Sequence, residues 1–146
     1  MPGPLAHQQA ALIAALVAGA GPPAGFDPGR VRATRAALLR KRAAEVGASW
    51  PLLAASIGTQ WSVEFGRWAD GRPPAGSLRD GWDFARTRGA LDRPAAEELA
   101  VREAGWRYEG LGPPRPRRAP AVRWARGTLV VQVLGRVWLR PLRRRP

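Results

Sequence analysis

Few side chains in this sequence could carry out catalysis or hold a metal ion. His7 is the only histidine and there is no cysteine. A serine–histidine–acid set and a histidine- or cysteine-based metal site therefore cannot be assembled from this chain alone. The neighbouring carboxylates Asp80 and Asp83 could in principle exchange protons, and so could Glu97 and Glu98, but no nucleophile or phosphate-binding glycine loop accompanies them. We expect no catalytic residue, no cofactor and no metal, and interpret the chain as a binding protein that is not an enzyme.

The chemistry that the chain does offer is positive charge. Of its 146 residues, 24 are Lys or Arg and 11 are Asp or Glu, which gives a net charge of +13. Ten of the arginines lie between Arg115 and Arg145, and no acidic residue follows Glu109. The first 112 residues hold the other 14 basic groups against 11 acidic ones, a net charge of +3. The basic excess therefore lies in the C-terminal tail and favours partners with phosphates or acidic peptide surfaces. One alternative is arginine-rich codon usage, since Lys41 is the only lysine.

The tail after residue 120 has the hydrophobic period of a β-strand. Its apolar and polar positions alternate with a period of two, the apolar ones being Leu129, Val131, Val133, Val137 and Leu139. This pattern predicts a strand or hairpin, with candidate turns at Arg126-Gly127 and Gly135 and a preceding strand at Val122 and Trp124. We expect a free strand edge between Thr128 and Leu139 to bind an extended peptide while arginines meet its acids. The candidate binding residues here are Arg126, Leu129, Val131, Val133, Arg136, Trp138 and Arg140.

A second candidate site lies in the middle of the chain. Asp27 followed by Pro28 predicts the start of a long helix that runs to about Val46. Arg35 and Arg42 project from the apolar side of this helix. We predict that these two arginines line a partner-binding groove. The alternative is that both reach past the core to solvent or pair with acids on another helix.

The remaining pattern predicts a mainly α protein: a compact bundle of five or six helices with a short C-terminal β-hairpin or strand appendage. Ser49, Trp50 and Pro51 predict a capped helix start, and the apolar residues that follow recur at helical spacing. Trp61, Phe65 and Trp68 share one face of the next helix and are interpreted as core. We divide the chain into a helical domain (1–110), a Pro/Arg-rich linker (111–120) and a basic strand-like tail (121–146).

The location of the protein is inferred from what the sequence lacks. The apolar stretch from Leu5 to Ala18 has no basic residue before it and is too short to cross a bilayer. A chain without cysteine is compatible with a reducing cytosol. We therefore expect a soluble, cytoplasmic protein, and a membrane is an unlikely partner even though Trp138 is followed by a basic C-terminal run.

An ordered set of residues runs through the helical part: Arg30 and Arg35, the pair Trp50-Pro51, Gly58 before Trp61, the pair Pro73-Pro74, and then Leu78, Gly81 and Phe84. In this order they resemble the N-terminal helical domain of HvfC/BufC-type bacterial proteins, a family often described as DNA-binding. The resemblance extends over roughly residues 5 to 108.

The resemblance implies a role in the biosynthesis of ribosomally made, modified peptides. Proteins of this type look like companions of multinuclear non-haem iron-dependent oxidative enzymes, which modify Cys-containing residues. The implied role is an adaptor that docks on the iron enzyme and helps to bind the leader of the precursor peptide, while the metal stays on the other chain. The alternative function is sequence-independent DNA or RNA binding, in which Trp124 and Trp138 stack on bases and arginines of the tail and long helix contact phosphates.

Overall fold

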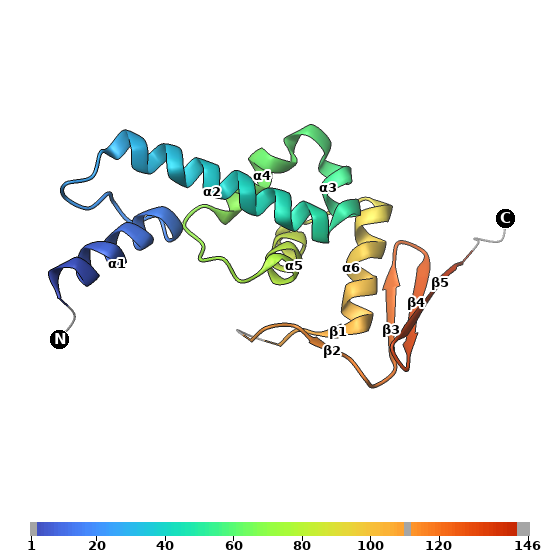
Figure 1. The fold of residues 1–146 in the computed structure, drawn as a ribbon. Coiled ribbons are helices and arrows are strands. Elements are labelled where there is room, and N and C mark those ends of the chain that lie inside the picture. Colours follow the sequence, from blue (N-terminus) through green and yellow to red (C-terminus); the bar gives the residue numbers. More distant parts are fainter. Residues whose placement is uncertain (1–2, 110–111, 143–146) are drawn as a thin grey trace.

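The computed structural model describes residues 3–109 and 112–142, and this part of the chain is mainly helical with β-structure at its C-terminal end (Figure 1). Its helices are α1 (Pro4–Val17), α2 (Pro28–Ser49), α3 (Pro51–Ile57), η1 (Gly58–Gln60), α4 (Trp61–Ala69), α5 (Ser77–Thr87) and α6 (Arg93–Gly105). Its strands are β1 (Trp106–Arg107), β2 (Arg115–Pro116), β3 (Ala121–Ala125), β4 (Thr128–Val133) and β5 (Arg136–Pro141). The predicted class, mainly α with a β appendage, is confirmed. The predicted boundary at residues 110 and 111 and the arginines Arg143, Arg144 and Arg145 lie outside the described residues.

Helix α2 is the longest element and begins where the sequence predicts. The carboxylate of Asp27 accepts a hydrogen bond from the backbone N–H of Arg30 at 2.7 Å, and Pro28 occupies the first helical position. Helix α2 packs against α1, α3, α4 and α5. Of α1, only Ala15 is buried, and this helix lies along the end of α2 that is remote from the C-terminal sheet (Figure 1). The helical core is therefore built by α2 to α6, and α1 lies at its periphery.

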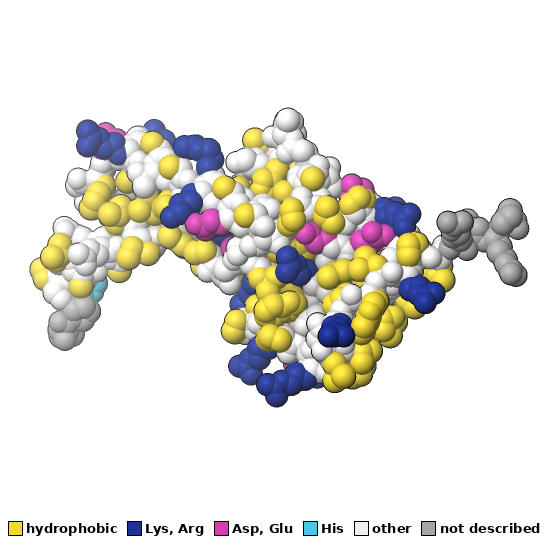
Figure 2. Space-filling view, turned by 45° about the vertical axis from the view of Figure 1, so that its right-hand side comes forward, with side chains coloured by type: hydrophobic (Ala, Val, Ile, Leu, Met, Phe, Trp, Pro, Cys, Tyr) yellow, Lys and Arg dark blue, Asp and Glu magenta, His cyan; other side chains and the backbone are white. Residues whose placement is uncertain are grey.

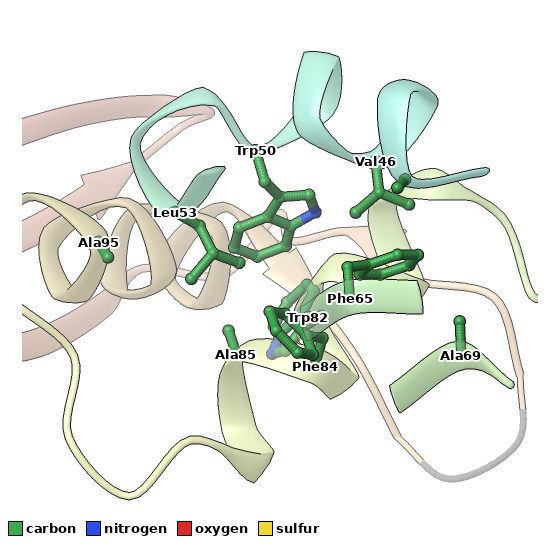
Figure 3. Packing of buried hydrophobic residues seen from close by; sticks show 10 residues of the cluster. Val46, Trp50, Leu53, Phe65, Ala69, Trp82, Phe84, Ala85 and Ala95 are labelled. Atoms are coloured by element: carbon green, nitrogen blue, oxygen red, sulfur yellow. The ribbon is translucent and has the colours of Figure 1, made fainter. Parts of the chain in front are cut away.

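Aromatic side chains fill the centre of the helical part. Trp50, Phe65 and Trp82 are almost completely buried and converge from three different helices or their ends (Figure 3). Trp61 stacks on Phe65 with ring centroids 5.3 Å apart. The predicted core role of the aromatic residues of α4 is confirmed, because Phe65 is fully buried and Trp61 packs against the same cluster.

One glycine makes this packing possible. A Cβ atom on Gly81 of α5 would lie 2.2 Å from Cδ1 of Trp50, far closer than non-bonded carbon atoms approach. The Trp50 ring has no room to move, because it is fully buried and its indole N–H donates to the carbonyl oxygen of Leu78 at 3.1 Å. Gly81 and Trp50 are thus two parts of one contact between the α2–α3 corner and α5.

The start of α3 is capped from a distant helix. We predict a cap from Ser49, and this prediction is wrong: Ser49 is the last residue of α2, and its hydroxyl donates to the hydroxyl of Ser77. The N-cap position is Trp50, whose side chain makes no capping bond. Glu98 of α6 takes this role instead, since its carboxylate accepts the N–H of Leu53 at 2.7 Å. Helix α6 therefore stabilises α3 by satisfying one of its free backbone donors.

Helix α6 also supports the C-terminal sheet. Ala100 and Ala104 of α6 form a second buried cluster with Ala125 and Val130 of the sheet. Small residues let the helix and the strands approach closely, so the tail packs on the helical part. Strand β2, inside the predicted linker, pairs in an antiparallel two-residue ladder with β1, at the end of the predicted helical domain.

Candidate functional site

The tail forms a three-stranded antiparallel sheet in the order β3-β4-β5. Residues 126–127 connect β3 to β4, and residues 134–135 connect β4 to β5, which are the turns that the sequence predicts. Both residues of each turn have positive φ: 46° and 83° for Arg126 and Gly127, and 49° and 78° for Leu134 and Gly135. These are the left-handed conformations that favour a tight two-residue hairpin.

One face of this sheet packs on α6. Val130 and Gln132 of β4 are completely buried, as is almost all of Thr128. The Thr128 hydroxyl donates to the carboxylate of Glu97 on α6, and this bond, together with Arg93, holds the pKa of Glu97 below its usual value. A charge-assisted hydrogen bond and a small apolar cluster therefore fix the sheet to α6.

The other face of the sheet is open and combines apolar with basic side chains. The register places Val131 between Val122 and Trp138, and Leu129 between Trp124 and Arg140. Trp124 is 62% exposed, Val122 57% and Trp138 48%. Val133 and Arg136 face one another at the end of the same face. We call this face the outer sheet face: Val122, Trp124, Leu129, Val131, Val133, Arg136, Trp138 and Arg140.

The outer sheet face contains most of the residues that the sequence analysis selects. Leu129, Val131, Val133, Arg136, Trp138 and Arg140 come together on it, whereas Val122 and Trp124 extend it from a strand not included in the candidate site. The described part of β3 to β5 carries no acidic side chain. Figure 2 shows hydrophobic and basic side chains close together over this part of the molecule.

The free strand edge differs from the predicted one. We expect an edge between Thr128 and Leu139, but β4 is the central strand and pairs with β3 on one side and β5 on the other. Strand β5 is an edge strand. Because antiparallel pairs alternate, and the pair that flanks a two-residue turn is the hydrogen-bonded one, the backbone groups of Val137 and Leu139 point away from β4. Backbone pairing with a peptide is therefore available along β5.

Arg126 lies in the turn between β3 and β4, and its side chain is exposed. The register puts this turn at the same end of the sheet as Arg140, because Thr128 pairs with Pro141. The opposite end carries Arg136. Positive charge is therefore present at both ends of the outer sheet face.

Arg35 and Arg42 are engaged inside the helical part. Arg35 forms an ion pair with Asp70, at the end of α4. Arg42 is nearly buried and its Nε donates to Asp80 at 2.8 Å. The described structure thus shows the pairing that the sequence analysis gives as the alternative for these two residues, and the segment of α2 that carries them lies far from the sheet (Figure 1). Their predicted contact with a partner stays a prediction.

Two features are absent from the described residues. Within residues 3–109 and 112–142, no three His, Asp or Glu side chains are grouped so that they could hold a metal ion. The same residues contain no helix with the length and apolar character needed to cross a membrane.

Comparison with known proteins connects the helical part to a family. The family model described as "SCO6045-like, C-terminal domain" matches residues 6–90, which span α1 to α5 and leave α6 and the sheet outside. A UPF0276 protein of Streptomyces avermitilis is 40% identical over 125 residues, which are 85% of this chain and 26% of the relative. The chain therefore spans about a quarter of that curated relative's length. No solved structure matches the chain.

Proposed function

The chain belongs to the SCO6045-like, C-terminal domain family, and on that premise we propose that it is a non-catalytic, cytoplasmic adaptor. It docks on a multinuclear non-haem iron-dependent oxidative enzyme and helps to bind the leader of a ribosomally synthesised precursor peptide. In this role it would act like the helical domain of HvfC/BufC-type proteins, which its helical part resembles. The metal and the oxidation chemistry belong to the partner.

The observation that carries the proposal is the outer sheet face. An extended leader can add to the free edge of β5 through its backbone, while its apolar side chains contact Trp138 and Val131. Arg136 and Arg140 lie on the same face and can pair with leader acids. With no carboxylate on these strands, an acidic peptide meets no repulsion from them.

The length of the curated relative supports the docking part of the proposal. About three quarters of the Streptomyces avermitilis protein lies outside the segment that matches this chain. A domain that is fused to a longer chain in one protein can bind the corresponding chain as a separate protein in another. Fusion raises the effective concentration of a contact that the two parts already make.

Binding of the leader peptide tests this proposal directly. The chain, an iron-dependent oxidative enzyme and that enzyme's precursor peptide would be purified, and leader binding measured by fluorescence anisotropy. The double variant R136E/R140E should weaken leader binding by at least about tenfold, because two charge-assisted contacts become repulsive. The matched control R32E/R40E makes the same charge change on exposed positions of α2 and should bind normally. Equal affinities for all three proteins would refute leader binding at the outer sheet face.

The exposed Trp124 and Trp138 favour nucleic-acid binding as a second function. Both indoles lie on the outer sheet face with arginines beside them, an arrangement that suits base stacking with phosphate contacts. The variant W124A/W138A separates the functions when single-stranded DNA is titrated at two salt concentrations. Specific stacking predicts a loss of about 1–3 kcal/mol per base contact. The adaptor function predicts only weak DNA binding that disappears with salt and is insensitive to this variant.

A further inference from the structure

A cavity in the helical part, away from the sheet, is a further candidate binding site. A cavity of about 490 Å³ opens between α2, α5 and the loop that follows α4. Its walls carry four guanidinium groups and two carboxylates, those of Arg42, Arg72, Arg79, Arg86, Asp80 and Asp83. The cavity can bind an anion only if at least one of these arginines has no acidic partner within the protein.

Arg42 and Asp80 neutralise each other. Their ion pair is almost completely buried, with Nε of Arg42 2.8 Å from the Asp80 carboxylate. The other nitrogens of Arg42 donate to the carbonyl oxygens of Arg72 and Pro73, and the second Asp80 oxygen accepts the N–H of Ala75. This pair holds the loop in place, and every nitrogen of Arg42 already donates to an acceptor within the protein.

Arg79 and Arg86 also have acidic partners. Nε of Arg79 lies 3.6 Å from the Asp83 carboxylate and donates to the Tyr108 hydroxyl at 2.9 Å. Arg86 pairs with Glu103 of α6 at 2.9 Å, a carboxylate that lies outside the cavity wall. Each of these two arginines thus has a carboxylate partner, and Glu103 is shared with Arg123 of β3, whose Nε lies 3.9 Å from it.

Arg72 is the fourth arginine, and it has no carboxylate partner among residues 3–109 and 112–142. Its position is nevertheless defined. Its Nε donates to the carbonyl oxygen of Trp68 at 2.8 Å, and its guanidinium lies over the Trp68 indole ring, 5.1 Å from the centroid. These contacts leave its two terminal nitrogens without an acceptor in the described structure. The cavity therefore presents one oriented, uncompensated positive charge.

We infer that this cavity binds a single carboxylate group carried by an acidic side chain of a bound peptide or protein, with Arg72 as its bidentate partner. Trp68, Pro73 and Thr87 line the same cavity and supply surface for the methylene groups of that side chain. One carboxylate supplies an acidic partner for the one wall arginine that has none in the described structure. The paired carboxylates of Asp80 and Asp83 line the same wall and disfavour a phosphate dianion more than a singly charged carboxylate. The inference concerns a site separate from the outer sheet face and does not depend on the proposed function.

Two probes that differ only in charge test the inference. N-acetylglutamic acid α-amide carries one side-chain carboxylate, and N-acetylglutamine α-amide is its neutral counterpart. Each would be titrated into the full chain at constant ionic strength while NMR follows the indole N–H signal of Trp68 and the backbone N–H signal of Thr87. The Trp68 signal is identified by its loss in Trp68→Phe. We expect a saturable shift with the carboxylate and none with the amide.

Variants then identify the residue responsible. Arg72→Gln should weaken binding of the carboxylate probe by about fivefold to tenfold, since a charge-assisted contact is lost. Arg40→Gln removes an exposed arginine from α2 outside the cavity and should leave the affinity unchanged. Thr87→Glu places a competing carboxylate at the cavity wall and should abolish binding.

Four results would overturn the inference. They are equal shifts from the two probes, an unchanged affinity in Arg72→Gln, unimpaired binding by Thr87→Glu, and tighter Arg72-dependent binding of inorganic phosphate than of the carboxylate probe. Because Arg72 and Thr87 are exposed, these variants are expected to keep the wild-type spectrum outside the cavity. Loss of leader binding at the sheet would leave this outcome unaffected, so the two proposals fail separately.

Discussion

Replacing Gly81 by alanine tests how strictly the aromatic core is built around one close approach. The added methyl group would lie 2.2 Å from Cδ1, 2.3 Å from Nε1 and 2.7 Å from Cγ of Trp50. The obstacle is a buried ring system and not the movable end of a long side chain. Either α5 or the indole must shift, and a shift of the indole breaks its hydrogen bond to Leu78.

The expected change in the free energy of unfolding combines two destabilising contributions and one stabilising contribution. Overpacking of a core costs about 1–3 kcal/mol, and leaving a buried indole N–H without its acceptor costs about 1–3 kcal/mol more. Alanine gains about 1 kcal/mol over glycine from its higher helix propensity. We expect Gly81→Ala to lower the free energy of unfolding by about 3 kcal/mol.

Urea denaturation followed by circular dichroism at 222 nm measures this effect. Gly66→Ala is the matched control, because Gly66 also lies within a helix and a Cβ atom there would meet nothing within 4 Å. The control should be as stable as the wild type or up to about 1 kcal/mol more stable. A Gly81→Ala protein as stable as the wild type would refute the packing argument, and equal losses in both variants would assign the effect to something other than the Trp50 contact.

Three further predictions concern a turn, a buried ion pair and a tyrosine. Leu134→Asn should raise the free energy of unfolding by about 1 kcal/mol, because asparagine tolerates the positive φ of this exposed turn position better than leucine; an unchanged or lower thermal midpoint would contradict this. Asp80→Asn should lower the free energy of unfolding by about 3 kcal/mol, because it leaves the buried Arg42 guanidinium without its counter-charge; a urea midpoint equal to that of the wild type would count against the pair. Burial is the largest cause that raises the pKa of Tyr108 above 10.0, and its hydrogen bond to Asp83 is the next. Because Tyr108 is the only tyrosine, absorbance at 295 nm reports its ionisation alone. Asp83→Asn should bring this pKa down towards its usual value. Since the folded pKa is the higher one, the stability that Tyr108 contributes is complete below pH 10 and is lost as the pH rises through the folded pKa; a wild-type pKa at or below 10.0 would contradict the assignment.

Local signals in the sequence predicted the start of α2 and the strands of the tail well. Asp27 and Pro28 act within one helical turn, and the two hairpin turns depend on glycines next to the strands they connect. The alternation of apolar and polar residues did not show how the turn at residues 134–135 changes which side chains share a face. Because Val133 pairs with Arg136, the turn shifts the phase, so that Trp138 joins Val131 on the outer sheet face and Val137 moves to the other side.

The features that the sequence could not predict depend on contacts between distant residues. Glu98 caps α3 from 45 residues away, whereas the nearby Ser49 looks like a cap and is not one. Arg42 is identifiable as an arginine on an apolar face, but its partner Asp80 lies 38 residues further along the chain. The charge excess at Arg72 becomes visible only when every neighbouring guanidinium has been matched to a carboxylate in three dimensions.

The double role of α6 determines the order in which parts of this protein can open. Ala95 belongs to the aromatic core and Ala104 to the cluster under the sheet, so the sheet has its main packing surface only while α6 is in place. A three-stranded sheet that loses its packed face is marginal in water. The strands can therefore open while the helices stay folded, whereas detachment of α6 opens the strands as well. Amide hydrogen exchange should accordingly be faster in β5 than in α6, and the proposed peptide-binding edge belongs to a cooperative unit that is less protected than α6.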